Sequence, residues 1–94
     1  MIVLLVEKAA PSLRGELTRW LIEPHSGVFV GCVSARVRDL LWQRVCRSIR
    51  DGAAILIYPA PVEQGFVIRS VGETTRLIED FEGVTLIKRR IPAK

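Results

Sequence analysis

The sequence has few of the side chains on which enzyme chemistry usually depends. Its 94 residues include one histidine, His25, and two cysteines, Cys32 and Cys46. A lone histidine without a serine or cysteine in a suitable motif gives no support for a catalytic triad, so we interpret His25 as an exposed turn residue. The cysteines form no C-x-x-C pair, and we expect both to be buried, reduced thiols.

Long apolar runs are absent as well. The apolar stretch Ile2–Val6 ends at Glu7 without a preceding basic segment, so it is too short for a signal peptide. No run approaches the roughly 18 residues that a membrane span needs. The glycines fit neither the dinucleotide-binding nor the phosphate-loop pattern. We therefore expect a cytoplasmic protein that has no membrane partner and no nucleotide site of those two types.

The charge balance favours one sign. The chain has 14 Lys and Arg residues against 10 Asp and Glu residues, and 11 of the 14 are arginine. Residues 1–50 hold eight bases and four acids, whereas residues 51–94 hold six of each. Arginine presents a planar fork that matches phosphate oxygens. A basic asymmetry of this kind indicates a polyanionic partner such as nucleic acid.

The hydrophobic pattern predicts strands alternating with helices, in the order β-α-β-α-β-β-β. Helices are expected to begin at Ser12 and Ser34, which are suitable N-caps, and residues 24–27 are expected to end the first helix. Such an order predicts a sheet with helices packed on it. A ferredoxin-like domain fits if residues 27–34 form one long bent strand or two short ones. The runs that predict strands are 2–6, 28–33, 53–58, 66–71 and 84–88.

Apolar residues recur at helical spacing in both predicted helices. In the first helix Leu13, Leu17, Trp20 and Leu21 share one face. Trp42 lies beside the apolar stripe of the second helix. We interpret both tryptophans as core or interface residues rather than as platforms for stacking bases.

Glu7 is the sharpest candidate for chemistry, because a carboxylate at the end of a strand often lines the working edge of an α/β sheet. A Mg²⁺ site usually takes one or two carboxylates together with waters and phosphate. Glu7 has no obvious carboxylate partner within one chain, although a symmetric dimer could bring two Glu7 side chains together. The alternative is a solvated or ion-paired glutamate.

Arg14, Arg36 and Arg38 are the stronger candidates for binding. All three lie in the first turn or two of a predicted helix, where backbone N–H groups and the helix dipole already favour an anion. The two helices would then present a surface that contacts phosphates, and a dimer would double it. Contacts of this type position a duplex without reading its sequence.

Three stretches resemble one family: residues 11–21 (PSLRGELTRWL), 27–31 (GVFVG) and 33–42 (VSARVRDLLW). It is the smaller of the two universal CRISPR spacer-acquisition proteins, in its type I-E form. The similarity extends from residue 1 to about 90 and is looser beyond residue 60, where Gly65, Phe66, Gly72, Arg76 and Gly83 carry it.

The resemblance implies an α+β fold, a ferredoxin-like βαββαβ domain over residues 1–94 with one or two extra C-terminal strands. It implies a homodimer held by the larger CRISPR integrase protein, on which a double-stranded DNA prespacer is bound and measured. The phosphate-contacting arginines of the family match Arg14, Arg36, Arg38 and Arg76. The resemblance further implies that residues 77–94 are a C-terminal strand and tail that would pair with the integrase through Val84, Leu86 and Ile87.

The family is also described as a metal-dependent endonuclease, with Mg²⁺ as the implied cofactor. The resemblance implies that the metal ligand and catalytic carboxylate would be the acidic residue at the end of the first strand, which is Glu7 here. Many relatives carry aspartate at that position. Cys32 stands where a close relative would have aspartate. Both departures disfavour a tightly coordinated metal ion. We therefore expect a non-catalytic DNA-binding scaffold, with a Mg²⁺-dependent nuclease acting on RNA or DNA as the alternative.

Overall fold

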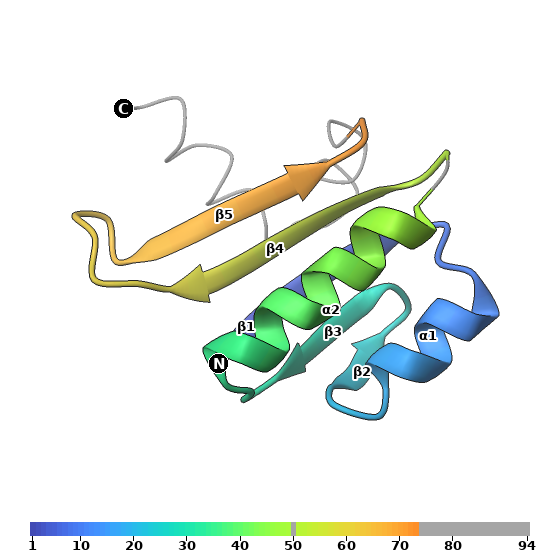
Figure 1. The fold of residues 1–94 in the computed structure, drawn as a ribbon, viewed down its shortest axis with the longest axis horizontal. Coiled ribbons are helices and arrows are strands. Elements are labelled where there is room, and N and C mark those ends of the chain that lie inside the picture. The colour runs from blue at the N-terminus through green and yellow to red at the C-terminus, as the bar shows by residue number, and fades with distance from the viewer. Residues whose placement is uncertain (50, 74–94) are drawn as a thin grey trace.

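Five strands and two helices make up the part of the chain that the computed structural model describes, residues 1–49 and 51–73. All strand pairs are antiparallel, and the order across the sheet is β2-β3-β1-β4-β5 (Figure 1). In chain order the elements are β1 (Ile2–Glu7), α1 (Pro11–Leu17), β2 (Ile22–His25), β3 (Val28–Gly31), α2 (Ala35–Ser48), β4 (Ala53–Pro59) and β5 (Phe66–Val71).

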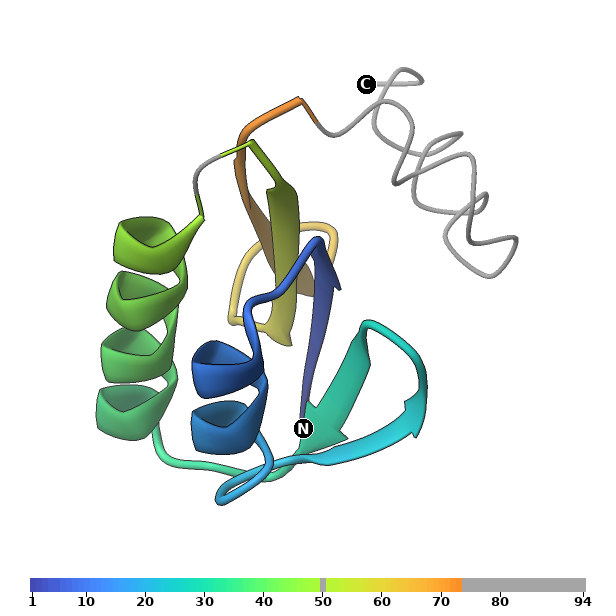
Figure 2. The same cartoon turned by 90° about the vertical axis from the view of Figure 1, so that its right-hand side faces the viewer.

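The first six elements follow the βαββαβ order, and β5 is added to the β4 edge. Both helices lie on one side of the sheet (Figure 2). This is the ferredoxin-like α+β topology with one extra strand, which confirms the predicted class. The second extra strand, predicted at residues 84–88, lies outside the described residues. Neither described helix has the length and apolar character to cross a membrane.

Several predicted boundaries are confirmed because their signals are local. The strands predicted at 2–6, 53–58 and 66–71 match β1, β4 and β5 to within one residue. Ser34 is the N-cap of α2, since its hydroxyl accepts a hydrogen bond from the Val37 N–H at 3.2 Å. That bond satisfies one of the N–H groups that the first turn of a helix leaves unpaired.

The predicted start and end of the first helix are wrong. Ala10 is the N-cap and Pro11 occupies the first helical position, which suits its fixed φ. The helix ends at Leu17, and residues 22–25, predicted to lie in the helix end and the following turn, form β2. β2 is an edge strand with mostly exposed side chains, and for that reason it tolerates Pro24 and lacks apolar alternation.

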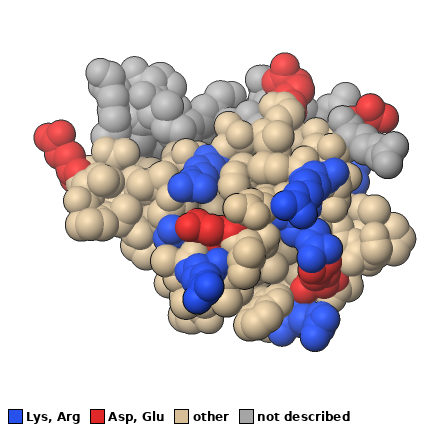
Figure 3. All heavy atoms as spheres, in the orientation of Figure 1, with Lys and Arg blue, Asp and Glu red and all other residues tan. Residues whose placement is uncertain are grey.

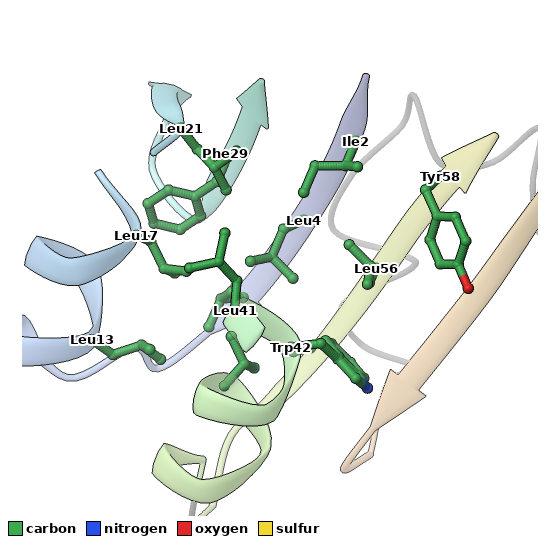
Figure 4. Close-up of a cluster of buried hydrophobic side chains, with 13 residues drawn as sticks. Ile2, Leu4, Leu13, Leu17, Leu21, Phe29, Leu41, Trp42, Leu56 and Tyr58 are labelled. Carbon is green, nitrogen blue, oxygen red and sulfur yellow. The ribbon is translucent and has the colours of Figure 1, made fainter. Parts of the chain in front are cut away.

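The main core lies between the helices and the sheet (Figure 4). Leu17, Phe29 and Val45 are fully buried within it, and Trp42 is buried as predicted. Trp20 is 52% exposed, so of its two predicted roles, core or interface, the core role is wrong and the interface role stays a prediction. Residues 18–20 form a turn after α1, which takes Trp20 off the buried face that Leu17 and Leu21 share.

The two cysteines also differ from the prediction. Cys32 and Cys46 are exposed, and neither forms a disulfide. Partial burial nevertheless raises the pKa of the Cys46 thiol, with nearby Arg69 acting in the opposite direction. A raised pKa keeps this thiol protonated and therefore weakly nucleophilic.

A second apolar cluster lies on the face of the sheet that the helices leave uncovered. Because side chains alternate along a strand, Leu4 and Val6 of β1 point to the helices while Leu5 points away. This second cluster combines buried Leu5, Ala53 and Ile55 with half-buried Val3, Val28, Ile57 and Ile68.

Candidate nucleic-acid interface

Arg14 projects from α1 and forms an ion pair with Glu23 of β2. The Arg14 side chain is 38% exposed and the Glu23 side chain 17%. Glu23 also accepts a hydrogen bond from the Gly27 N–H at 2.9 Å. That backbone hydrogen bond, and then Arg14, lower the pKa of the Glu23 carboxyl. Glu23 thus fixes the Arg14 guanidinium in place and offsets part of its charge.

Arg36 and Arg38 lie in the first turns of α2, which contain no acidic residue before Asp39. Arg36 is exposed, and none of the ion pairs formed within residues 1–49 and 51–73 involves it. Arg38 is 18% exposed, and its Nε donates to Asp39 at 3.1 Å. Its guanidinium also lies over the Tyr58 ring, 3.8 Å from the ring centre, in a cation–π contact. Arg36 therefore presents an available charge, whereas Arg38 is held rigidly.

A further arginine, Arg69 of β5, joins this group. Its guanidinium lies 5.8 Å from the centre of the Tyr58 ring and 4.0 Å from Asp39, and the side chain is 44% exposed. Glu23, Tyr58 and Arg69 were not singled out from the sequence. Each makes its contact with a residue of another helix or strand, so no local sequence pattern marks it.

The candidate arginines fall into two groups at opposite ends of the sheet. The Gly27 carbonyl accepts from the Val6 N–H, so the Arg14–Glu23 pair lies near the end of β1. Arg38 lies over the ring of Tyr58. Tyr58 follows Ile57, which pairs with Val3 in the β1–β4 register, so Arg38 lies near the start of β1. Strand rise places the two levels roughly 10–15 Å apart. The two helices that were expected to present a phosphate-contacting surface thus carry two separate cationic points.

The helix side of the molecule carries Lys and Arg side chains in separate patches. In the space-filling view these patches lie over the helices, with Asp and Glu side chains between some of them (Figure 3). A further ion pair, Arg44 to Glu16 at 3.2 Å, joins α2 to α1. A surface of this sign attracts a polyanion over distances of about one Debye length, some 8–10 Å at moderate salt.

Glu7 lies at the end of β1 and is half-buried, and its backbone is opposite that of Ala53 in the antiparallel pair of β1 and β4. It lines a hollow of about 170 Å³ together with Lys8, Asp51 and Glu73. The sequence suggested no carboxylate near Glu7 within one chain, but the pairing of β1 with β4 and of β4 with β5 brings Asp51 and Glu73 to this hollow.

A Mg²⁺ ion prefers several oxygen ligands in octahedral geometry. Among residues 1–49 and 51–73, no group of three His, Cys, Asp or Glu side chains is placed to hold a metal ion. The hollow also has Lys8 in its lining. The described residues therefore do not fit a metal centre enclosed by a single chain.

The remaining candidate residues all follow Glu73 in the chain. Arg76 and the partner-binding residues Val84, Leu86 and Ile87, with the whole of segment 77–94, lie outside the described residues.

The structure defines a class: a ferredoxin-like α+β domain with an extra edge strand and a basic helix side. A family model described as "CRISPR-associated protein (Cas_Cas2CT1978)" matches residues 1–86. The chain belongs to this family of CRISPR-associated proteins, which is of the Cas2 type. The resemblance seen in the sequence is thereby confirmed at the level of the family.

Proposed function

We propose that this chain is a non-catalytic, dimeric scaffold of the CRISPR spacer-integration complex. It acts in the cytoplasm and binds prespacer DNA through the phosphate backbone of the duplex. The observation that carries the proposal is the pair of cationic points, Arg14 at one end of the helix side and Arg36 with Arg38 at the other. Family membership supports the CRISPR setting.

Two separate cationic points suit the backbone of a duplex. Phosphates of one strand recur about every 3.4 Å along the helix axis, so basic groups at two levels of the sheet can contact different phosphates of the same duplex. Backbone contacts of this kind fix the register of a duplex and carry no sequence information. A protein that stores arbitrary DNA segments needs that indifference to sequence.

Dimer formation is supported by the second apolar cluster. Val3, Val28, Ile57 and Ile68 are only half-buried on the face of the sheet that the helices leave uncovered. A second copy packed on this face would remove their remaining apolar surface from water, at about 25 cal/mol per Å². Two copies would also double the number of cationic points.

Attachment to the larger integrase protein is assigned to residues 77–94, with Val84, Leu86 and Ile87 as the contact residues. The short, mostly apolar run of residues 84–88 (VTLIK) suits strand addition to the edge of a partner sheet. Arg76 would add a phosphate contact beside that segment.

The second candidate function is a Mg²⁺-dependent endonuclease acting on RNA or DNA. It is favoured by one observation: Glu7, Asp51 and Glu73 line the same hollow. Within the described residues no three such side chains are placed to hold a metal, so we rank the scaffold first. Labelled RNA and duplex DNA incubated with Mg²⁺ or with EDTA distinguish the two functions, because only a nuclease gives Mg²⁺-dependent cleavage.

Assembly tests the proposal. Sedimentation of the full chain should give a dimer, and gel filtration with its cognate integrase and duplexes of unrelated sequence should give one complex containing all three. Affinity should be nearly equal for those duplexes. A chain that stays monomeric, or that the integrase–DNA complex excludes, would overturn the scaffold.

A further inference from the structure

The two helices enclose a groove that the proposed DNA contacts do not use. Its volume is about 330 Å³, and it lies on the outer side of α1 and α2. Trp20 and Leu40 line it together with Val37. The core beneath is complete, since neighbouring Leu41 is buried and Val45 is fully buried. The groove is therefore a surface feature and not a packing defect.

The apolar lining of this groove is unusually exposed. Trp20 is 52% exposed and Leu40 is 57% exposed. The other large hydrophobic residues exposed among the described residues are Met1, Ile22 and Val62, and none of them lines this groove. Large apolar side chains gathered on one surface commonly mark an interaction site. Tryptophan in particular is enriched among the residues that dominate binding energy at protein interfaces.

The rim of the groove carries positive charge. Arg44 and Arg47 line it, and the one acidic residue of the lining, Glu16, already pairs with Arg44 at 3.2 Å. No ion pair within residues 1–49 and 51–73 involves Arg47. The groove therefore matches a partner that combines apolar side chains with carboxylates.

We infer that this groove docks an acidic, amphipathic helix of a protein partner. Apolar side chains spaced three and four residues apart on that helix pack against Trp20 and Leu40, while its carboxylates pair with Arg44 and Arg47. A phosphate backbone could reach the two arginines, but it would leave Trp20 and Leu40 in water. The inference is independent of DNA binding, because Arg14, Arg36 and Arg38 do not line the groove.

The probe is a synthetic amphipathic peptide of about fifteen residues, long enough to form a helix, with leucines on one face and glutamate and alanine on the rest. It is titrated into the full, ¹⁵N-labelled chain, and the same peptide with lysine in place of glutamate serves as control. Indole N–H signals give a direct readout, because exposed Trp20 should shift on binding while buried Trp42 should not.

Variants test the site without disturbing the core, since the side chains chosen are exposed. Leu40→Glu should lower the affinity for the acidic peptide by roughly 30-fold, as expected for a central contact residue. Arg47→Glu should lower the same affinity by about 3-fold or more, as expected for a charge at the rim. Val62→Glu, an exposed apolar residue outside the groove, should leave the affinity unchanged.

Three results would each overturn the inference. The two peptides could bind equally or not at all. Trp20 could shift on addition of duplex DNA and not of peptide, which would make the groove a nucleic-acid surface. Trp20 could shift with protein concentration alone, which would make it a contact between copies of this chain.

Discussion

Replacing Arg36 with alanine should reduce the salt dependence of duplex binding more than the loss of another exposed arginine on the same helix. Arg36 lies in the first turn of α2, is exposed, and takes part in none of the ion pairs described within residues 1–49 and 51–73. Its charge is therefore available to a phosphate without the loss of an existing contact.

The magnitude follows from counterion release. Each phosphate that a protein neutralises on B-DNA adds about 0.9 to the slope of log K against log salt. Arg14, Arg36 and Arg38, each present twice in a dimer, give a slope of about −5. Arg36→Ala removes two of these contacts, so the slope should fall to between about −3 and −4. The loss should be the same for duplexes of different sequence, because phosphates carry no sequence information.

The assay is fluorescence anisotropy with a labelled duplex over a range of salt concentrations. Arg47→Ala is the matched control, since Arg47 is an exposed arginine near the opposite end of α2. The control should change the slope by less than about 0.5, well under the step for one phosphate. A flat response to salt in the wild type, or equal slopes for the wild type and Arg36→Ala, would refute the phosphate-contact reasoning.

Three further changes report on the fold. The pKa of the Glu23 carboxyl is lowered in the folded chain, so this group stabilises the fold at neutral pH, and that stabilisation is lost as pH falls below the ordinary pKa of 4.5. Between neutral and acid pH, the melting temperature of Glu23→Gln should therefore fall less than that of the wild type. Outside the backbone of α1 itself, no atom of the described residues lies within 4 Å of a Cβ added at Gly15, so Gly15→Ala should raise the free energy of unfolding in urea by about 0.5–1 kcal/mol. A decrease would contradict an open site. Leu17 is fully buried, and Leu17→Ala should lower the same quantity by about 2–5 kcal/mol, whereas a loss below 1 kcal/mol would show a site that relaxes readily.

The sequence was sufficient for elements whose signals are local. The apolar run of β1 and the Ser34 cap of α2 predicted both elements closely. β2 was missed because an edge strand buries little and so shows no alternation. The end of α1 was missed because Leu17 and Leu21 keep helical spacing through a turn, where the Leu21 N–H still donates to the Leu17 carbonyl at 2.9 Å.

The candidate site was predicted only in part, for a related reason. Arg14, Arg36 and Arg38 could be found because their positions near helix starts can be read from the chain. Their partners could not, because Glu23 and Tyr58 reach them only where a helix packs beside a strand. Glu23 holds Arg14, and Tyr58 holds Arg38, whereas none of the ion pairs described involves Arg36.

The central claim, that the chain is a scaffold and not a nuclease, is tested most directly by spacer integration. The full chain and its cognate integrase are assayed with a prespacer and a CRISPR array, comparing wild type with Glu7→Ala, and Glu63→Ala at an exposed turn position serves as control. Gel filtration of each mixture confirms that the complex has formed. If the chain is a scaffold, Glu7→Ala leaves integration unchanged. Loss of integration by an assembled Glu7→Ala complex would contradict the scaffold and would assign chemistry to the carboxylate at the end of β1.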